Sequence, residues 1–273
     1  MKTLLALLLS LAAAPSLAAD TIKLALTGPY SGGSAPMGTS TRDGSKLAIS
    51  EINAAGGIPV GGKKLKLEFV ERDDEAKNER GALIAQELAA MPDLAGVVGS
   101  VNTGVVLAGD KHLQDAGIPK IICPAAGSAS MTQWTDKPNQ PGPKELYIFR
   151  FAAHDGIQSA MVIEEAIRRN LLKVALFHDA TNYGVSGRDD MLDQIKKQGN
   201  KLQVVTVEKF NIGDKDMTAQ LLKSKSLGAQ PIKWRRYLKR SSLVERIENA
   251  RNDSFSNCWS RWWLKTSAFC LSN

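Results

Sequence analysis

Residues 121–130 read IICPAAGSAS. The apolar run ends at Cys123, and the small residues that follow indicate a buried strand that ends in a tight loop. Such a loop leaves backbone N–H and C=O groups free and lets a ligand approach closely. Because ligands of open α/β sheets lie just beyond the carboxyl ends of strands, the stretch predicts a binding loop. The alternative is a strand-to-loop turn that binds nothing.

A second loop of the same kind lies upstream and favours the ligand-binding interpretation. It is Gly99–Gly104, which reads GSVNTG and follows the apolar pair Val97-Val98. Two small-residue loops that each follow an apolar strand are therefore the candidate site.

Strand-like and helix-like segments alternate along the first half of the chain. The expected strands are residues 22–27, 64–71, 95–99, 119–123 and 147–151. The expected helices are residues 39–55, 75–90 and 103–116, with Leu83, Ile84 and Leu88 directed inward from the second of them. Residues 125–144 are expected to be irregular. This alternation is typical of a parallel, doubly wound α/β sheet and predicts a first lobe over residues 20–150.

The alternation of helices and strands starts again after Phe151. Helices are expected at residues 155–170, 184–198 and 215–224, and strands at residues 173–179 and 202–210. The pattern predicts a second, partial α/β lobe over residues 151–230. The two lobes are expected to rotate about strands that cross near Tyr147–Ala153.

The first 19 residues have the pattern of a secretory signal peptide. Lys2 supplies the positive end, Leu4–Ala14 is an apolar segment too short to span a bilayer, and small residues precede Ala19. We therefore expect cleavage after this segment and export to the periplasm. Cys123 is the one cysteine of the main body and is interpreted as a small buried hydrophobe.

The sequence changes character after Gly228. All 23 glycines occur up to that residue, whereas four of the five tryptophans follow it. Residues 231–273 hold nine Lys or Arg and three Asp or Glu, a net charge of +6. The formal charge of the whole chain is +7, so all the other residues together carry a net charge of +1. One explanation is a basic, aromatic tail that binds nucleic acid or membrane. The favoured hypothesis is a shifted reading frame that truncates the second lobe.

Several motifs, in this order and spacing, resemble a known family. They are Gly28–Gly32 (GPYSG), Glu51–Ile58 (EINAAGGI), Val97–Ser100 (VVGS), Pro124–Ser128 (PAAGS), Tyr147–Arg150 (YIFR) and Asn182–Gly184 (NYG). Over about residues 22–228 the chain resembles the type I periplasmic solute-binding proteins of ABC transporters. Within them it resembles the group that binds the branched-chain amino acids leucine, isoleucine and valine.

The resemblance implies a fold of two doubly wound lobes that close on an amino acid like a hinged trap. It places the ligand's carboxylate at Thr103, which follows Asn102, and backbone contacts at Ala125 and Gly127. The family often has threonine at position 127, and Ser128 is the expected replacement for the missing hydroxyl.

The resemblance also assigns Tyr183 to the second lobe, where it would close over the ligand, whereas Tyr30 is a candidate contact to the ligand side chain. The acidic partner of the ligand ammonium is expected beyond Gly228 and has no identified counterpart. The implied partners are an amino acid and an inner-membrane permease, with a monomeric protein and no cofactor. The alternative function is a sensor whose closure is read by a regulatory partner.

Each of these positions also has a simpler interpretation. Thr103 stands at the start of a helix, where it would be a plain N-cap. Ala125 and Gly127 would be ordinary turn residues. For Tyr183 the alternative is an ordinary surface tyrosine, and for Tyr30 it is packing.

Other classes of function find little support in the sequence. The three histidines lack the spacing of a metal motif, and neither G-x-S-x-G nor a P-loop is present. Asp73-Asp74 is interpreted as a helix start rather than a metal site. The nearly neutral main body does not favour nucleic acid. We therefore expect a binding protein and not an enzyme.

Overall fold

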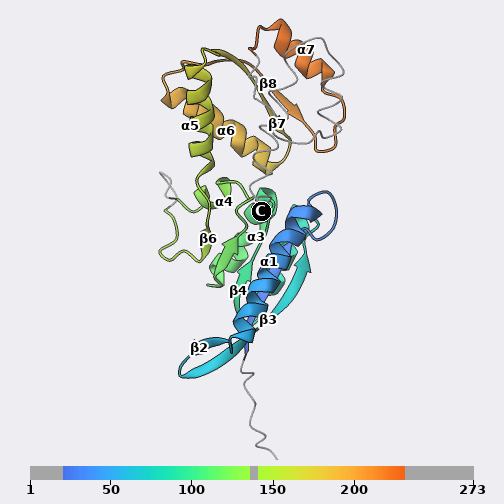
Figure 1. The fold of residues 1–273 in the computed structure, drawn as a ribbon, viewed down its shortest axis with the longest axis vertical. Helices are drawn as coiled ribbons and strands as arrows, with labels where there is room; N and C mark the ends of the chain where they lie inside the picture. The colour runs from blue at the N-terminus through green and yellow to red at the C-terminus, as the bar shows by residue number, and fades with distance from the viewer. Residues whose placement is uncertain (1–20, 136–140, 231–273) are drawn as a thin grey trace, which may run out of the picture.

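The computed structural model describes residues 21–135 and 141–230 and contains two α/β bodies stacked along the long axis (Figure 1). The first body contains β1 (Thr21–Gly28), α1 (Ala35–Ala54), β2 (Ile58–Val60), β3 (Lys63–Asp73), α2 (Asn78–Ala89), β4 (Leu94–Val98), α3 (Thr103–Asp115), β5 (Lys120–Ile122), α4 (Ala129–Thr132) and β6 (Ile148–Arg150). The second contains α5 (Asp155–Arg168), β7 (Lys173–Asp179), α6 (Asn182–Lys197), β8 (Gln203–Phe210) and α7 (Thr218–Ser226). The expected α/β class is confirmed.

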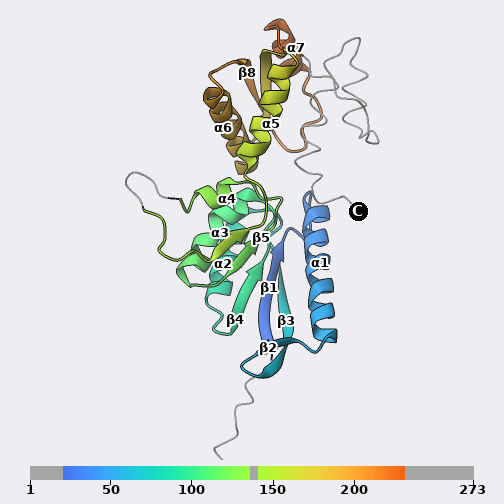
Figure 2. The ribbon, with the colours of Figure 1, turned by 60° about the vertical axis from the view of Figure 1, so that its left-hand side comes forward.

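The first body is built on a six-stranded sheet in the order β2-β3-β1-β4-β5-β6. All neighbouring pairs are parallel except β2 and β3, which form an antiparallel hairpin. Helix α1 covers one face of this sheet, and α2 and α3 cover the other (Figure 2). The carboxyl ends of β4 and β5 therefore lie side by side, which places the loops that follow them next to each other.

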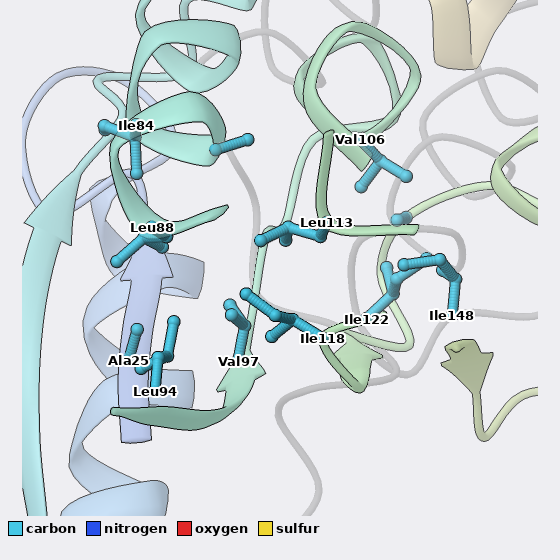
Figure 3. Packing of buried hydrophobic residues seen from close by; sticks show 12 residues of the cluster. Ala25, Ile84, Leu88, Leu94, Val97, Val106, Leu113, Ile118, Ile122 and Ile148 are labelled. Atoms are coloured by element: carbon cyan, nitrogen blue, oxygen red, sulfur yellow. The ribbon is translucent and has the colours of Figure 1, made fainter. Parts of the chain in front are cut away.

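The main core lies between the sheet and the helices α2 and α3. Ile84 and Leu88 of α2 and Leu113 of α3 point toward Ala25 and Val97 of the sheet, and all five are buried (Figure 3). Burial of a Leu or Ile side chain stabilises a fold by about 1.5–3 kcal/mol. This packing fixes α2 and α3 against the same face of the sheet.

Three elements of the first body differ from the prediction. Helix α1 begins at Ala35 rather than at residue 39, with a proline in its first turn, where its missing N–H costs nothing. The sequence pattern also misses β2, which is joined to β3 through Gly61 and Gly62, both at positive φ (55° and 82°). Two successive residues of positive φ suit a tight hairpin turn. The short helix α4 lies in the segment that was expected to be irregular.

The interpretation of Asp73-Asp74 as a helix start is wrong. Helix α2 begins at Asn78, and the two carboxylates instead hold the turn that precedes it. Asp73 Oδ1 accepts from the backbone N–H of Glu75 at 2.9 Å, and Asp74 Oδ1 accepts from that of Ala76 at 2.9 Å. Both turn residues have positive φ (52° and 58°), so these bonds hold backbone that non-glycine residues rarely adopt.

A pair of charges is buried inside the first body. Lys120 of β5 and Asp110 of α3 form an ion pair of 2.5 Å, with side chains 4% and 0% exposed. Lys120 Nζ also donates to Ser100 Oγ at 3.2 Å. A cavity of about 10 Å³ adjoins the pair and is also lined by Asp74. One carboxylate oxygen of Asp74 and one of Asp110 have no hydrogen-bond partner in the structure as described.

The second body has its own core. Its strands β7 and β8 form a parallel pair, and helices α5 and α6 pack together. Ile163, Met191 and Ile195 of these helices are buried with Val174 of β7. Within residues 151–230 the structure thus contains two strands of the second sheet.

Some expectations fall on residues that the structure does not describe. The expected signal peptide at residues 1–19 and the basic segment at residues 231–273 both lie outside the described ranges. Cys123 lies within them and is a buried free thiol, as expected. Over the described parts of the chain, each helix is too short or too polar to cross a bilayer.

Candidate functional site

The two predicted loops meet at Gly127. Its backbone N–H donates to Thr103 Oγ1 at 2.8 Å, and both residues are buried. Thr103 is the first residue of α3, and Gly127 lies in the turn after β5. Because β4 and β5 are neighbours in the sheet, their following loops are brought together as the sequence predicts.

Gly127 is also a point where the two bodies touch. A Cβ at this position would lie 3.0 Å from Tyr183 Cδ2, 3.1 Å from Asp155 Oδ2 and 3.2 Å from Thr103 Oγ1. Tyr183 belongs to α6 and Asp155 to α5, so residues of the first and second bodies converge on one backbone position. We call Thr103, Gly127, Ser128, Asp155 and Tyr183 the Gly127 cluster.

Replacing Gly127 with alanine should therefore disturb the contact between the bodies. Contacts of 3.0–3.2 Å are tighter than ordinary packing, and overpacking of this kind costs about 1–3 kcal/mol. We expect a lower melting temperature for Gly127→Ala in thermal unfolding of the full chain. Gly33→Ala is the matched control, because a Cβ at that loop glycine meets nothing within 4 Å. Equal melting temperatures for the two variants would contradict the described contact.

Ser128 connects the bodies through two hydrogen bonds. Its backbone N–H donates to Asp155 Oδ2 at 2.8 Å, and its hydroxyl donates to Asp190 Oδ2 at 3.2 Å. Burial raises the pKa of Asp190. Ser128 is one of the site residues predicted from the sequence, whereas its two acidic partners are not. Asp155 is the first residue of α5, and Asp190 lies within α6. Both helices are ordinary amphipathic helices, and no local sequence pattern marks either carboxylate as a site residue.

The N-terminus of α3 has no side-chain cap from its N-cap residue. Asn102, and not Thr103, occupies the N-cap position, and its side chain makes no capping hydrogen bond. Asn102 Nδ2 instead donates to Ser34 Oγ at 3.3 Å, and its Oδ1 is buried without a partner in the described structure. The plain N-cap interpretation of Thr103 is thus wrong. Uncapped first-turn N–H groups and the positive end of the helix dipole suit a carboxylate.

A second helix begins beside the first. Tyr183 is the second residue of α6 and is half-buried. A Cβ at Gly104 of α3 would lie 2.7 Å from Oδ1 of Asn182, the first residue of α6. The N-termini of α3 and α6 are therefore neighbours. Two positive dipole ends at one place strengthen the preference for an anionic group.

Two of the predicted site residues stand apart from these contacts. Ala125 is half-buried in the loop, two residues before Gly127. Tyr30 is held elsewhere, because its backbone N–H donates to Asp73 Oδ1 at 2.8 Å and its ring lies 5.1 Å from the Arg42 guanidinium. Burial raises the pKa of the Tyr30 phenol. The structure thus brings Tyr30 against α1 rather than into the Gly127 cluster.

A metal centre is not supported at this site. Within residues 21–135 and 141–230, the structure contains no group of three or more His, Cys, Asp or Glu residues that could hold a metal ion. The functional groups at this site are backbone N–H and C=O groups, hydroxyls, two carboxylates and one aromatic ring. These groups can bind a small zwitterion.

Known proteins share this architecture. Residues 21–232 match the family described as periplasmic binding protein. The Leu/Ile/Val-binding protein homolog 3 of Brucella melitensis is 29% identical over 82% of this chain and 57% of its own length. The leucine-, isoleucine-, valine-, threonine-, and alanine-binding protein of Pseudomonas aeruginosa is 30% identical over 79% of this chain and 53% of its own length.

A solved structure agrees with these relatives. It is the branched-chain amino acid transporter substrate binding protein LivJ of Streptococcus pneumoniae in complex with isoleucine. The likeness has a TM-score of 0.60 and 29% identity and covers 75% of this chain and 54% of that one. The chain spans about half the length of the curated relatives it matches.

Proposed function

The chain belongs to the family of periplasmic binding proteins, whose members bind substrates rather than convert them, and we therefore propose a receptor role. The protein is the extracytoplasmic substrate-binding component of an ABC transporter. It captures a branched-chain or related amino acid between its two lobes and delivers it to an inner-membrane permease. The similar solved structure is that of a transporter substrate binding protein, which favours transport over the alternative of a sensor.

The observation that carries this proposal is the convergence of both bodies on Gly127. The ligand carboxylate would bind at the N-terminus of α3, beside Asn102 and Thr103. The ligand ammonium would lie toward the carbonyl of Ala125 and the second-lobe carboxylates Asp155 and Asp190. Tyr183 would cover the ligand from α6.

Such a site explains how binding would close the protein. A ligand shifts an open–closed equilibrium only as far as it binds the closed state more tightly. Groups from the first body alone would bind both states equally, whereas Asp155 and Tyr183 add contacts in the closed state. We propose that lobe one covers residues 20–150 and that the partial lobe two covers residues 151–230. We also propose that the protein is a periplasmic monomer, exported through residues 1–19.

The test is calorimetric titration of the full chain with isoleucine, leucine and valine. Thr103→Ala should weaken binding about tenfold or more, because it removes a hydroxyl beside the proposed carboxylate position. Thr103→Ser is the matched control that keeps the hydroxyl and should bind nearly as the parent does. Thr103→Ala also leaves the Gly127 N–H without its acceptor, so melting temperatures are recorded alongside. Cooperative melting with no amino-acid binding by the parent chain would refute the receptor role.

A further inference from the structure

We propose that Arg150 is a positioning residue that ties the binding loop after β5 to the segment joining the two bodies. Arg150 is the last residue of β6, and α5 of the second body begins five residues later. Its side chain is 4% exposed. The consequence for ligand binding rests on the receptor role proposed above, whereas the geometry itself does not.

The Arg150 guanidinium holds the binding loop on one side. Its Nε donates to the carbonyl of Ala126 at 2.8 Å, and Nη2 reaches the carbonyl of Pro124 at 3.4 Å. These carbonyls flank Ala125, and that of Ala126 immediately precedes Gly127. The loop that carries the proposed ligand contacts is therefore held by a side chain from a neighbouring strand.

The same guanidinium holds the joining segment on its other side. Nη1 donates to the carbonyl of Ala153 at 3.1 Å and reaches that of Ala152 at 3.4 Å. Nη2 forms an ion pair of 3.1 Å with Asp155 Oδ1. All three acceptors lie between the end of β6 and the first residue of α5, where a rotation of one body against the other must be absorbed.

Asp155 closes these contacts into a ring. One of its carboxylate oxygens accepts from Arg150, and the other accepts from the backbone N–H of Ser128 at 2.8 Å. The ring runs from Arg150 through Asp155 to Ser128, along the loop to Ala126, and back to Arg150. A change in backbone dihedrals at Ala152–Ala153 would either break these hydrogen bonds or move the loop with the joining segment. The loop and the joining segment therefore change conformation together.

Only arginine can make this set of bonds. A guanidinium presents five N–H donors in a rigid planar fork, whereas a lysine ammonium is a single point with three donors. Arg150→Lys keeps the positive charge beside Asp155 but cannot reach the carbonyls on both sides at once. The substitution therefore separates the fork geometry from the charge.

The test is hydrogen exchange of backbone amides in the full chain, without ligand. In Arg150→Lys the Ser128 and Gly127 amides should exchange about tenfold faster or more, while amides of Val106 and Leu113 in α3 keep their rates. Arg168→Lys is the matched control, because Arg168 makes a similar two-bond contact to Glu165 on the exposed face of α5. It should leave the loop amides unchanged.

Two results would overturn the proposal. One is an unchanged Ser128 amide in Arg150→Lys. The other is an equal acceleration of loop and α3 amides, which would show a purely structural role. If Arg150→Lys does not fold, Asp155→Ala serves instead, because it removes the acceptor of the Ser128 N–H. It should accelerate Ser128 but not Gly127, whose amide donates to Thr103. Calorimetry on the same samples measures amino-acid binding, which tests the receptor role. Hydrogen exchange without ligand tests the positioning role, so the failure of one can be distinguished from the failure of the other.

Discussion

Replacing Lys120 with methionine is expected to lower the free energy of unfolding by about 3–5 kcal/mol. The side chain of Lys120 is 4% exposed and pairs with Asp110, whose side chain is 0% exposed. Methionine has a similar length and is apolar, so the packing is largely kept. The loss arises because Asp110 then remains as a buried charge without a counter-ion. Urea unfolding of parent and variant at neutral pH measures it.

A double variant separates charge from packing. Replacing a buried ion pair by apolar residues of similar size is often neutral or stabilising, because neither charge then has to leave water. Lys120→Met combined with Asp110→Leu should therefore recover most of the stability that Lys120→Met loses. A double variant as unstable as the single one would mean that the loss comes from packing. A single variant within about 0.5 kcal/mol of the parent would mean that the pair is not buried as described.

The periodicity of the sequence was enough to predict most of the fold. The strand expected at residues 173–179 has the same bounds as β7, because its apolar run is flanked by charged residues. Side-chain direction was less predictable. Leu83 was expected to point inward with Ile84 and Leu88 but is 65% exposed. Helical spacing locates the apolar face of α2 only to within about one residue at each edge. The packing of α2 on α3 then decides which of the edge residues are buried.

The candidate site was only half predictable, for a physical reason. Thr103 and Gly127 each follow an apolar strand, and parallel strands bring their carboxyl ends to one edge of the sheet. The acidic groups reach the site differently. Asp155 and Asp190 contact Ser128 from 27 and 62 residues away, through the packing of the second body on the first. No local sequence pattern reports a contact of that kind.

The contribution of Asp74 to the stability of the protein should rise as the solution is acidified through about pH 6. The residue is 1% exposed, one of its carboxylate oxygens has no partner among the described residues, and burial raises its pKa to about 6. The N–H of Ala76 and the charges of Lys120 and Arg80 oppose this rise, whereas the charge of Asp73 adds to it. Between the unfolded value of 3.8 and about 6, the folded state binds more protons than the unfolded state.

The sign and size of the effect follow from this linkage. The contribution of Asp74 to stability is complete below pH 3.8 and is lost as the pH rises through 6. A pKa difference of about two units corresponds to about 3 kcal/mol. Asp74→Asn cannot titrate, so the unfolding free energy of the parent minus that of Asp74→Asn should fall by about this amount between pH 4 and pH 7. Urea unfolding across this range measures the difference.

The neighbouring carboxylate gives a control of opposite sign. Burial alone would raise the pKa of Asp73, but hydrogen bonds from the Ser31 hydroxyl and from the backbone N–H groups of Glu75 and Tyr30 lower it. The stabilising contribution of Asp73 is therefore present above pH 3.8 and is lost at lower pH. The parent minus Asp73→Asn difference should rise with pH only below about 3.8 and stay nearly constant between pH 4 and pH 7, where the Asp74→Asn difference falls. Two differences of the same slope would mean that the acid response comes from the net charge of the protein and not from the burial of Asp74.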